Sequence, residues 1–182
     1  MAEFELSKTF PYARQRVFTA YRDELETLPP YLENIESIQV TDRTESQPGV
    51  VAQVARWQAV EKGNLPRLAR PFVSKDILVW IDHATWNADK HTCDWWFEFP
   101  AFPGGGVVCQ GHNWYEAQGE DACLLVLTGR LTIDLAKIRG VPRLARGLGP
   151  RLESFVLERV RPNLETTTAA IGRLLADAES AR

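Results

Sequence analysis

Apolar and polar residues alternate over much of this chain, a period of two that is typical of strands with one buried face. Turn residues such as Pro48-Gly49 and Asn87-Ala88-Asp89 separate these alternating segments from one another. The predicted strands cover residues 4–10, 35–44, 50–60, 76–86, 91–99, 107–117 and 122–135. Because consecutive strands are joined mostly by short connections, we predict an antiparallel, seven-stranded sheet.

Two regions have helical spacing instead. A helix is predicted to begin at Pro11 and to end before Pro29-Pro30, and a second short helix should follow it. Residues 150–178 then repeat apolar residues at intervals of three and four: Leu152, Phe155, Val156, Val160, Leu164, Ile171, Leu174 and Leu175. The fold class is therefore α+β, with a curved sheet wrapped around one long C-terminal helix. Such a sheet leaves a cavity beside its helix, which indicates a container for a small molecule or lipid.

The order of these elements resembles the helix-grip fold of the START-like superfamily, also called the SRPBCC or polyketide cyclase/dehydrase and lipid-transport superfamily. The resemblance is carried by FPYARQRVFTAY (10–21), LPPYLENIESIQV (28–40), DILVWIDHATW (76–86) and TGRLTIDL (128–135), followed by the long helix. It covers nearly the whole chain, but it rests on element order and hydrophobicity rather than on catalytic motifs. It implies a cavity for hydrophobic ligands, in a superfamily whose members carry lipids or catalyse cyclisation or dehydration.

Composition narrows the classes of function. The length of 182 residues suits a single START-like domain, residues 1–182. The formal net charge of −3 argues against nucleic-acid binding. The chain shows no signal peptide and no apolar run long enough to cross a bilayer, so we expect a cytoplasmic protein. The three cysteines lack metal-type spacing, so we expect reduced structural thiols, no metal and no cofactor.

Alternation also predicts which side chains face the cavity. The loop between the strands at 91–99 and 107–117, centred on Pro103, places Asp94 opposite His112 on the outer face. An Asp–His pair is enzyme-like chemistry, but this register makes it an exposed cross-strand pair. Two registers are possible for the strand at 76–86. A turn centred between Ala88 and Asp89 puts Asp82 inward, and a shift by one residue would put His83 there instead. We favour the first register, because it brings two further tryptophans into the aromatic cluster.

The residues expected to line the cavity and bind the ligand are therefore largely aromatic. They are Trp80, Asp82, Trp86, Trp95, Phe97, Phe99, Asn113, Tyr115 and Leu127. In such a setting, desolvation should raise the pKa of Asp82. A network of buried, hydrogen-bonded structural groups is the alternative interpretation.

A short repeat, LPRLAR at 65–70 and VPRLAR at 141–146, follows two strands that end on the same side of the predicted sheet as the loop with Phe102. The basic and apolar rim predicted there comprises Arg67, Arg70, Phe102, Arg143 and Arg146. Such a rim suits contact with an anionic membrane surface, whereas solvated loop arginines are the alternative.

The sequence thus predicts a protein that binds a hydrophobic or amphipathic small molecule or lipid in an interior cavity. The alternatives are a cavity enzyme of the polyketide cyclase or dehydratase type, and an interaction subunit with a filled cavity. In the third case, Trp96 and Trp114 on the outer face would mediate assembly.

Overall fold

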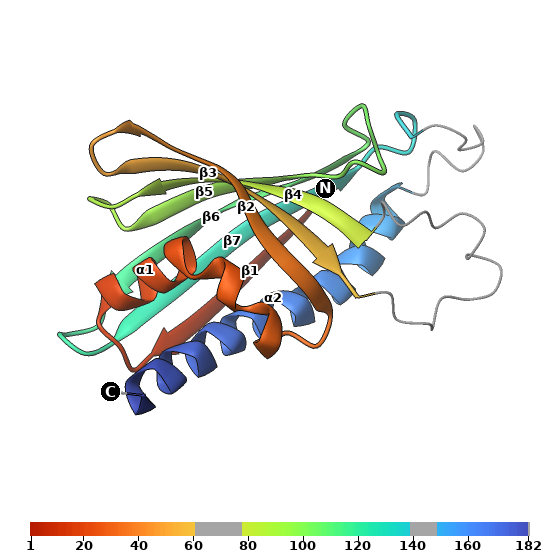
Figure 1. The fold of residues 1–182 in the computed structure, drawn as a ribbon. Coiled ribbons are helices and arrows are strands. Elements are labelled where there is room, and N and C mark those ends of the chain that lie inside the picture. Colours follow the sequence, from red (N-terminus) through yellow and green to blue (C-terminus); the bar gives the residue numbers. More distant parts are fainter. Residues whose placement is uncertain (61–77, 139–148, 182) are drawn as a thin grey trace.

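The structure, a computed structural model, describes residues 1–60, 78–138 and 149–181, with only the backbone described at 150–152 and 154–163. Its elements follow the predicted order (Figure 1). They are β1 (Ala2–Phe10), α1 (Arg14–Asp23), the 3-10 turns η1 (Leu25–Thr27) and η2 (Pro29–Tyr31), β2 (Ile35–Gln47), β3 (Val50–Ala59), β4 (Val79–Asn87), β5 (Thr92–Glu98), β6 (Val107–Ala117), β7 (Cys123–Ile133) and α2 (Gly149–Ser180).

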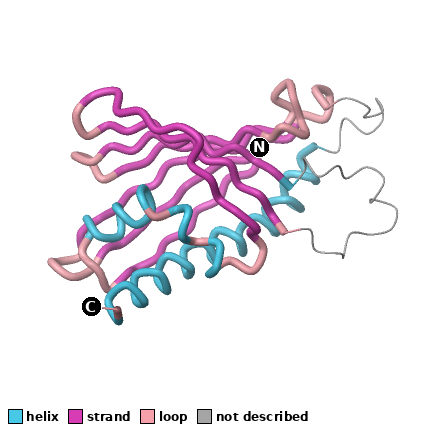
Figure 2. Tube along the Cα trace, in the orientation of Figure 1, coloured by secondary structure: helices cyan, strands magenta, loops and turns pink. Residues whose placement is uncertain are grey.

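The strands form one seven-stranded antiparallel sheet in the order β1-β7-β6-β5-β4-β3-β2. Neighbours in this order are consecutive in the chain except at β1, which pairs with the last strand. Both helices lie on the same side of the curved sheet (Figure 2). The predicted α+β helix-grip architecture is therefore confirmed.

The start of α1 differs from the prediction. The helix begins at Arg14, and its N-cap Ala13 has an extended backbone with ψ of 140°. Pro11 lies outside it, directly after the last residue of β1. Because proline has no N–H to donate to a ladder, it ends the strand rather than starting the helix.

The core lies between the helices and the inner face of the sheet. The principal sheet contacts of α2 are with β1 and β7, at one side of the sheet. Its Ala170, Ile171 and Leu175 are almost completely buried there. Helix α1 contributes its own buried stripe: Val17, Phe18, Ala20 and Tyr21.

Two glycines shape the inner face of β6 and β7. Gly111 and Gly129 are direct cross-strand partners. A Cβ atom at Gly111 would lie 2.3 Å from the Trp95 ring, and one at Gly129 would lie 2.3 Å from the Phe4 ring. Two aromatic side chains thus pack directly onto the backbone, where any other residue would collide with them.

Candidate functional site

The two faces of β5 and β6 are arranged as predicted. Asp94 pairs with His112 in the sheet register. The opposite face carries the buried side chains of this strand pair: Cys93, Trp95, Cys109, Asn113 and Tyr115. The predicted register between these strands is therefore confirmed.

Strand β4 also presents the predicted face to the interior. Ala84 and Trp86 are buried, and Asp82 shares their side of the strand. The connecting turn is centred between Asp89 and Lys90, one residue later than predicted, because Asn87 pairs with Thr92. Moving the centre of the turn by one residue shifts the strand pairing by two residues. Because side chains alternate between the faces with a period of two, each side chain keeps its face.

All the residues predicted to bind ligand thus belong to the inner face, but they differ in burial. Five are buried: Trp86, Trp95, Asn113, Tyr115 and Leu127. Four are half-buried: Trp80, Asp82, Phe97 and Phe99. That these residues bind a ligand stays a prediction.

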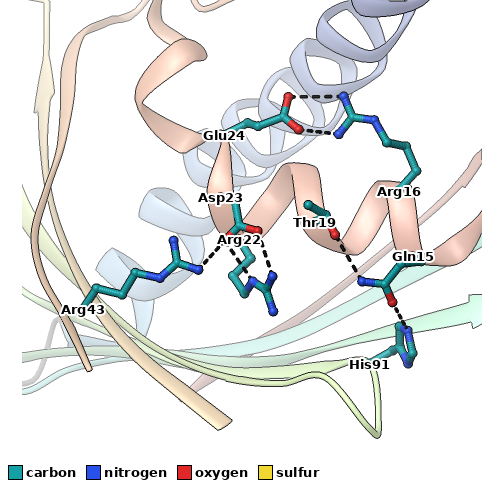
Figure 3. Close-up of polar contacts among 8 residues, drawn as sticks. All are labelled: Gln15, Arg16, Thr19, Arg22, Asp23, Glu24, Arg43 and His91. Atoms are coloured by element: carbon teal, nitrogen blue, oxygen red, sulfur yellow. Dashed lines mark hydrogen bonds and ion pairs between the residues drawn. The ribbon is translucent and has the colours of Figure 1, made fainter. Parts of the chain in front are cut away.

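Helix α1 covers the more deeply buried end of this face. The Phe18 ring packs edge-on against Trp86 and Tyr115, with ring centroids 5.5 Å and 5.4 Å apart. Polar contacts hold the helix near both of its ends (Figure 3). His91 Nε2 lies 2.8 Å from Gln15 Oε1, and Arg43 on β2 forms an ion pair with Asp23.

The other end of the inner face is more accessible. The half-buried residues belong to β4 and β5 or directly follow β5, whereas the principal sheet contacts of α2 are with β1 and β7. Aromatic rings nevertheless pack against one another in this region. Trp57 stacks on Trp80 with ring centroids 5.5 Å apart, and Trp95 stacks on Phe97 at 4.9 Å.

Some polar atoms on this inner face are buried without a hydrogen-bond partner among the described residues. They are both amide atoms of Gln53 and the indole nitrogen of Trp86. Other buried polar groups lie near one another: Trp57 near Asp82, Tyr115 near Asn113, and Tyr21 of α1 near Thr168 of α2. Buried polar groups are nearly always hydrogen-bonded in proteins. The Gln53 and Trp86 atoms are therefore the polar groups of the described interior that most lack a partner.

Asp82 is the one carboxylate among these groups. Burial raises the pKa of Asp82 to about 7, and the nearby Trp57 indole N–H opposes that shift. No arginine, lysine or histidine of the described residues forms an ion pair with it. Asp82 can therefore exchange a proton near neutral pH.

The cysteines have a structural character. Cys93, Cys109 and Cys123 are all free and buried. Desolvation raises the pKa of each thiol, to about 12 for Cys109 and about 11 for Cys123. They remain neutral thiols at physiological pH, which makes them poor nucleophiles. Across the described ranges, no cluster of three metal-ligating side chains occurs.

The Asp94–His112 pair lies on the outer face. His112 Nδ1 lies 2.6 Å from Asp94 Oδ1, and the Asp94 side chain is 73% exposed. An open hollow of about 610 Å³ adjoins this pair, with charged residues such as Glu3 and Arg130 at its edge. An apolar ligand would stay in contact with water there, so we place the candidate site on the inner face.

The rim lies mostly outside the described residues. Arg67, Arg70, Arg143 and Arg146 all belong to the two undescribed segments. Phe102 is described and half-buried, in the loop after β5, where its N–H donates to the Phe99 carbonyl oxygen at 2.9 Å. Because the sheet is antiparallel throughout, β3, β5 and β7 end at the same side of it, as predicted.

Three inner residues of interest were missed in the sequence. Gln53 and Trp57 lie on one face of β3, where alternation from Val51 onwards would have placed both inward. Tyr21 lies on the buried side of α1, and only the packing of the helices reveals that its hydroxyl lies near Thr168 of α2.

Comparison with known proteins identifies the fold. No protein-family model matches the chain, and no curated protein matches it. Solved structures do. TTHA0849 from Thermus thermophilus matches with a TM-score of 0.67 and 20% identity, over 97% of this chain and 99% of that one. The Zhui aromatase/cyclase from Streptomyces sp. R1128 matches with a TM-score of 0.64 and 16% identity, over 94% and 91%.

A third match is norcoclaurine synthase from Thalictrum flavum, with a TM-score of 0.60 and 11% identity, over 97% of this chain and 87% of that one. The chain has a START-like helix-grip fold. Structures that share this fold also include the di-domain ARO/CYC BexL and a START superfamily protein from Mycobacterium smegmatis. At these identities the likeness concerns the fold alone. In the described part of this START-like chain, no helix is both long and apolar enough to cross a membrane.

Proposed function

We propose that this protein binds a hydrophobic or amphipathic small molecule or lipid between the inner face of its sheet and its helices. The observation that carries the proposal is the set of buried polar atoms on that face, among which the Gln53 amide and the Trp86 indole nitrogen have no partner in the described part of the chain. Leaving one buried donor or acceptor unsatisfied costs about 1–3 kcal/mol. A ligand that hydrogen-bonds to several of them would remove these costs.

The composition of the wall supports the same function. Small-molecule sites are lined mainly by apolar and aromatic side chains, with a few polar groups that fix the ligand's orientation. Here, aromatic rings from β3, β4, β5 and β6 surround the polar atoms. A simple acyl chain would leave those atoms unpaired, so the preferred ligand carries several oxygen or nitrogen groups along an apolar body.

A cavity enzyme of the cyclase or dehydratase type is the second candidate, and Asp82 is the observation that favours it. With a pKa of about 7, its carboxyl group is present in both protonation states at neutral pH. A general acid or base needs this property. The likeness to the Zhui aromatase/cyclase adds an analogy based on fold.

Native mass spectrometry of the purified protein tests the proposal directly. We expect a small molecule to co-purify, and the neutral fluorophore N-phenyl-1-naphthylamine to bind the protein once it has been freed of that molecule. Trp86→Phe, which keeps an inner ring but removes its N–H, should weaken rebinding of the co-purified molecule several-fold. Trp114→Phe, on the outer face, is the matched control and should leave rebinding unchanged.

The outcomes separate the candidates. Conversion of the bound molecule to a product of different mass during incubation would favour the enzyme. A cooperative melt with neither a co-purified molecule nor fluorophore binding would refute the container. The interior would then be filled, and the exposed Trp96 and Trp114 would favour an interaction subunit.

A further inference from the structure

The surroundings of Asp82 suggest which chemical group of the ligand it meets. Its direct cross-strand neighbours are Ala55 on β3 and Phe97 on β5. Ala84, the next inward residue on β4, is also small. Short side chains thus flank Asp82 on two sides and lower the inner wall around it, and we call this part of the wall the Asp82 recess.

Aromatic rings border this recess. Trp57 and Trp80 are stacked partners, Trp80 lies 6.5 Å from Phe97 between ring centroids, and Phe97 contacts Phe99 at 6.3 Å. The ring faces carry negative electrostatic potential, so a group of rings attracts a cation that is stripped of water. A carboxylate among such rings adds a full negative charge to that potential.

The described part of the chain supplies no positive partner for this charge. Asp82 Oδ1 is completely buried, and the nearby group that stabilises its charge is the uncharged indole N–H of Trp57. The titratable groups that interact with Asp82 there are the thiols of Cys93 and Cys109, and both are neutral at physiological pH. Buried charges in proteins are usually paired.

We propose that the Asp82 recess, bordered by Trp57, Trp80 and Phe97, binds the ammonium group of a hydrophobic amine. This inference rests on the proposed function, because the ammonium group is one end of the ligand held in the cavity. The carboxylate accepts hydrogen bonds from the ammonium N–H groups, and the rings stabilise the positive charge of the ammonium group. The apolar body of the ligand then lies along the inner wall.

Three indole compounds of similar size provide the test, because they differ mainly in one end group. Tryptamine ends in an ammonium group, tryptophol in a hydroxyl group and indole-3-propionate in a carboxylate. Their affinities are measured at pH 8 by displacement of N-phenyl-1-naphthylamine from the ligand-free protein. We expect tryptamine to bind about tenfold more tightly than tryptophol, and indole-3-propionate to bind most weakly.

Two variants assign the preference to this recess. Asp82→Asn should bring tryptamine and tryptophol to similar affinities, whereas Asp94→Asn, on the outer face, should keep the wild-type order. Trp80→Leu, which keeps the carboxylate, should reduce the preference severalfold. The affinity of the wild type for tryptamine should also fall as the pH decreases from 8 to 5.5, because Asp82 then becomes neutral, and Asp82→Asn should remove this dependence.

Failure of this inference is distinguishable from failure of the proposed function. If all three compounds displace the fluorophore equally, or indole-3-propionate binds best, the ammonium site is refuted and the container stands. If the fluorophore does not bind and no molecule co-purifies, both are refuted. Because the comparison of the three end groups uses the wild-type protein, it remains decisive even if Asp82→Asn fails to fold.

Discussion

The indole N–H of Trp95 donates a hydrogen bond to Oδ1 of Asn113 at 2.9 Å, and both side chains are buried. This bond joins β5 to β6 in the interior. It also divides the polar groups of the inner wall into two kinds. Trp95 and Asn113 bond to each other and stabilise the fold, whereas the indole nitrogen of Trp86 has no partner among the described residues.

Replacing Asn113 with alanine should therefore lower the free energy of unfolding by about 1–3 kcal/mol, because it leaves the buried Trp95 N–H without an acceptor. Urea denaturation measures this change. The control, Asp94→Asn, affects an exposed pair and should change stability by less than about 1 kcal/mol. Equal effects of the two substitutions would show that the buried bond contributes little.

Two glycine substitutions should have opposite effects. Gly111→Ala places a Cβ atom 2.1 Å from the Thr128 carbonyl oxygen, so we expect a loss of at least about 1–3 kcal/mol from overpacking. Gly172→Ala, inside α2, brings its Cβ no closer than 3.9 Å to Phe10 and should stabilise the protein by about 0.5–1 kcal/mol. Thermal melts of both variants check the sign, and a stable Gly111→Ala protein would contradict the packing described for Trp95.

Asp82 should make stability depend on pH in the ligand-free protein. Between about pH 4, where an unfolded aspartate ionises, and about pH 7, where Asp82 ionises in the fold, only the unfolded chain loses the proton. Ionisation then favours unfolding, so the wild type should lose stability relative to Asp82→Asn as the pH rises across this interval. Below and above it the difference should be constant. A difference that does not change between pH 5 and pH 8 in urea denaturation would show that Asp82 ionises at its ordinary pKa.

Tyr115→Phe should separate stability from binding. The Tyr115 hydroxyl is buried and lies near Asn113 without a hydrogen bond of ordinary geometry in the part of the chain that the structure describes, so its removal should leave the ligand-free protein about equally stable. The same substitution should weaken binding of a hydrogen-bonding ligand, as measured by titration calorimetry with the co-purified molecule. If the variant is much less stable than the wild type, the hydroxyl makes a structural hydrogen bond and the reasoning fails.

The predicted rim gives a test in solution. Replacing Arg67, Arg70, Arg143 and Arg146 together with glutamine should sharply reduce any co-sedimentation with anionic vesicles, since each base near such a surface is worth roughly 1 kcal/mol. Binding of the wild type should also weaken as salt rises, through screening. If wild type and variant pellet equally, the arginines play no part in membrane contact.

Alternation was sufficient to predict most of the fold. The face of each strand depends only on parity, so the sequence places Asp94 and His112 outward and Asn113 and Tyr115 inward. For the same reason the predicted inward face of β4 is correct, although the turn after it lies one residue later than predicted. Local patterns were weaker at element ends, as at Pro11, where a missing N–H suits either the end of a strand or the start of a helix.

The polar content of the site was harder to predict. Whether a buried group has a partner depends on atoms from several elements, so the difference between Trp95 and Trp86 is invisible in sequence. Gln53 alternates into the interior like its apolar neighbours, and only its burial in the fold identifies it as unusual. Spatial convergence, rather than any motif, defines this candidate site.

The glycine pair of β6 and β7 has a consequence for altering the interior. At Gly111 and Gly129 the wall has no side chains of its own, and the rings of Trp95 and Phe4 cover the peptide groups. Shortening either ring would therefore do more than enlarge the space. It would uncover bare main chain that a polar compound could reach, so ligand selectivity in this protein can be re-engineered from the neighbouring strands without touching the glycines.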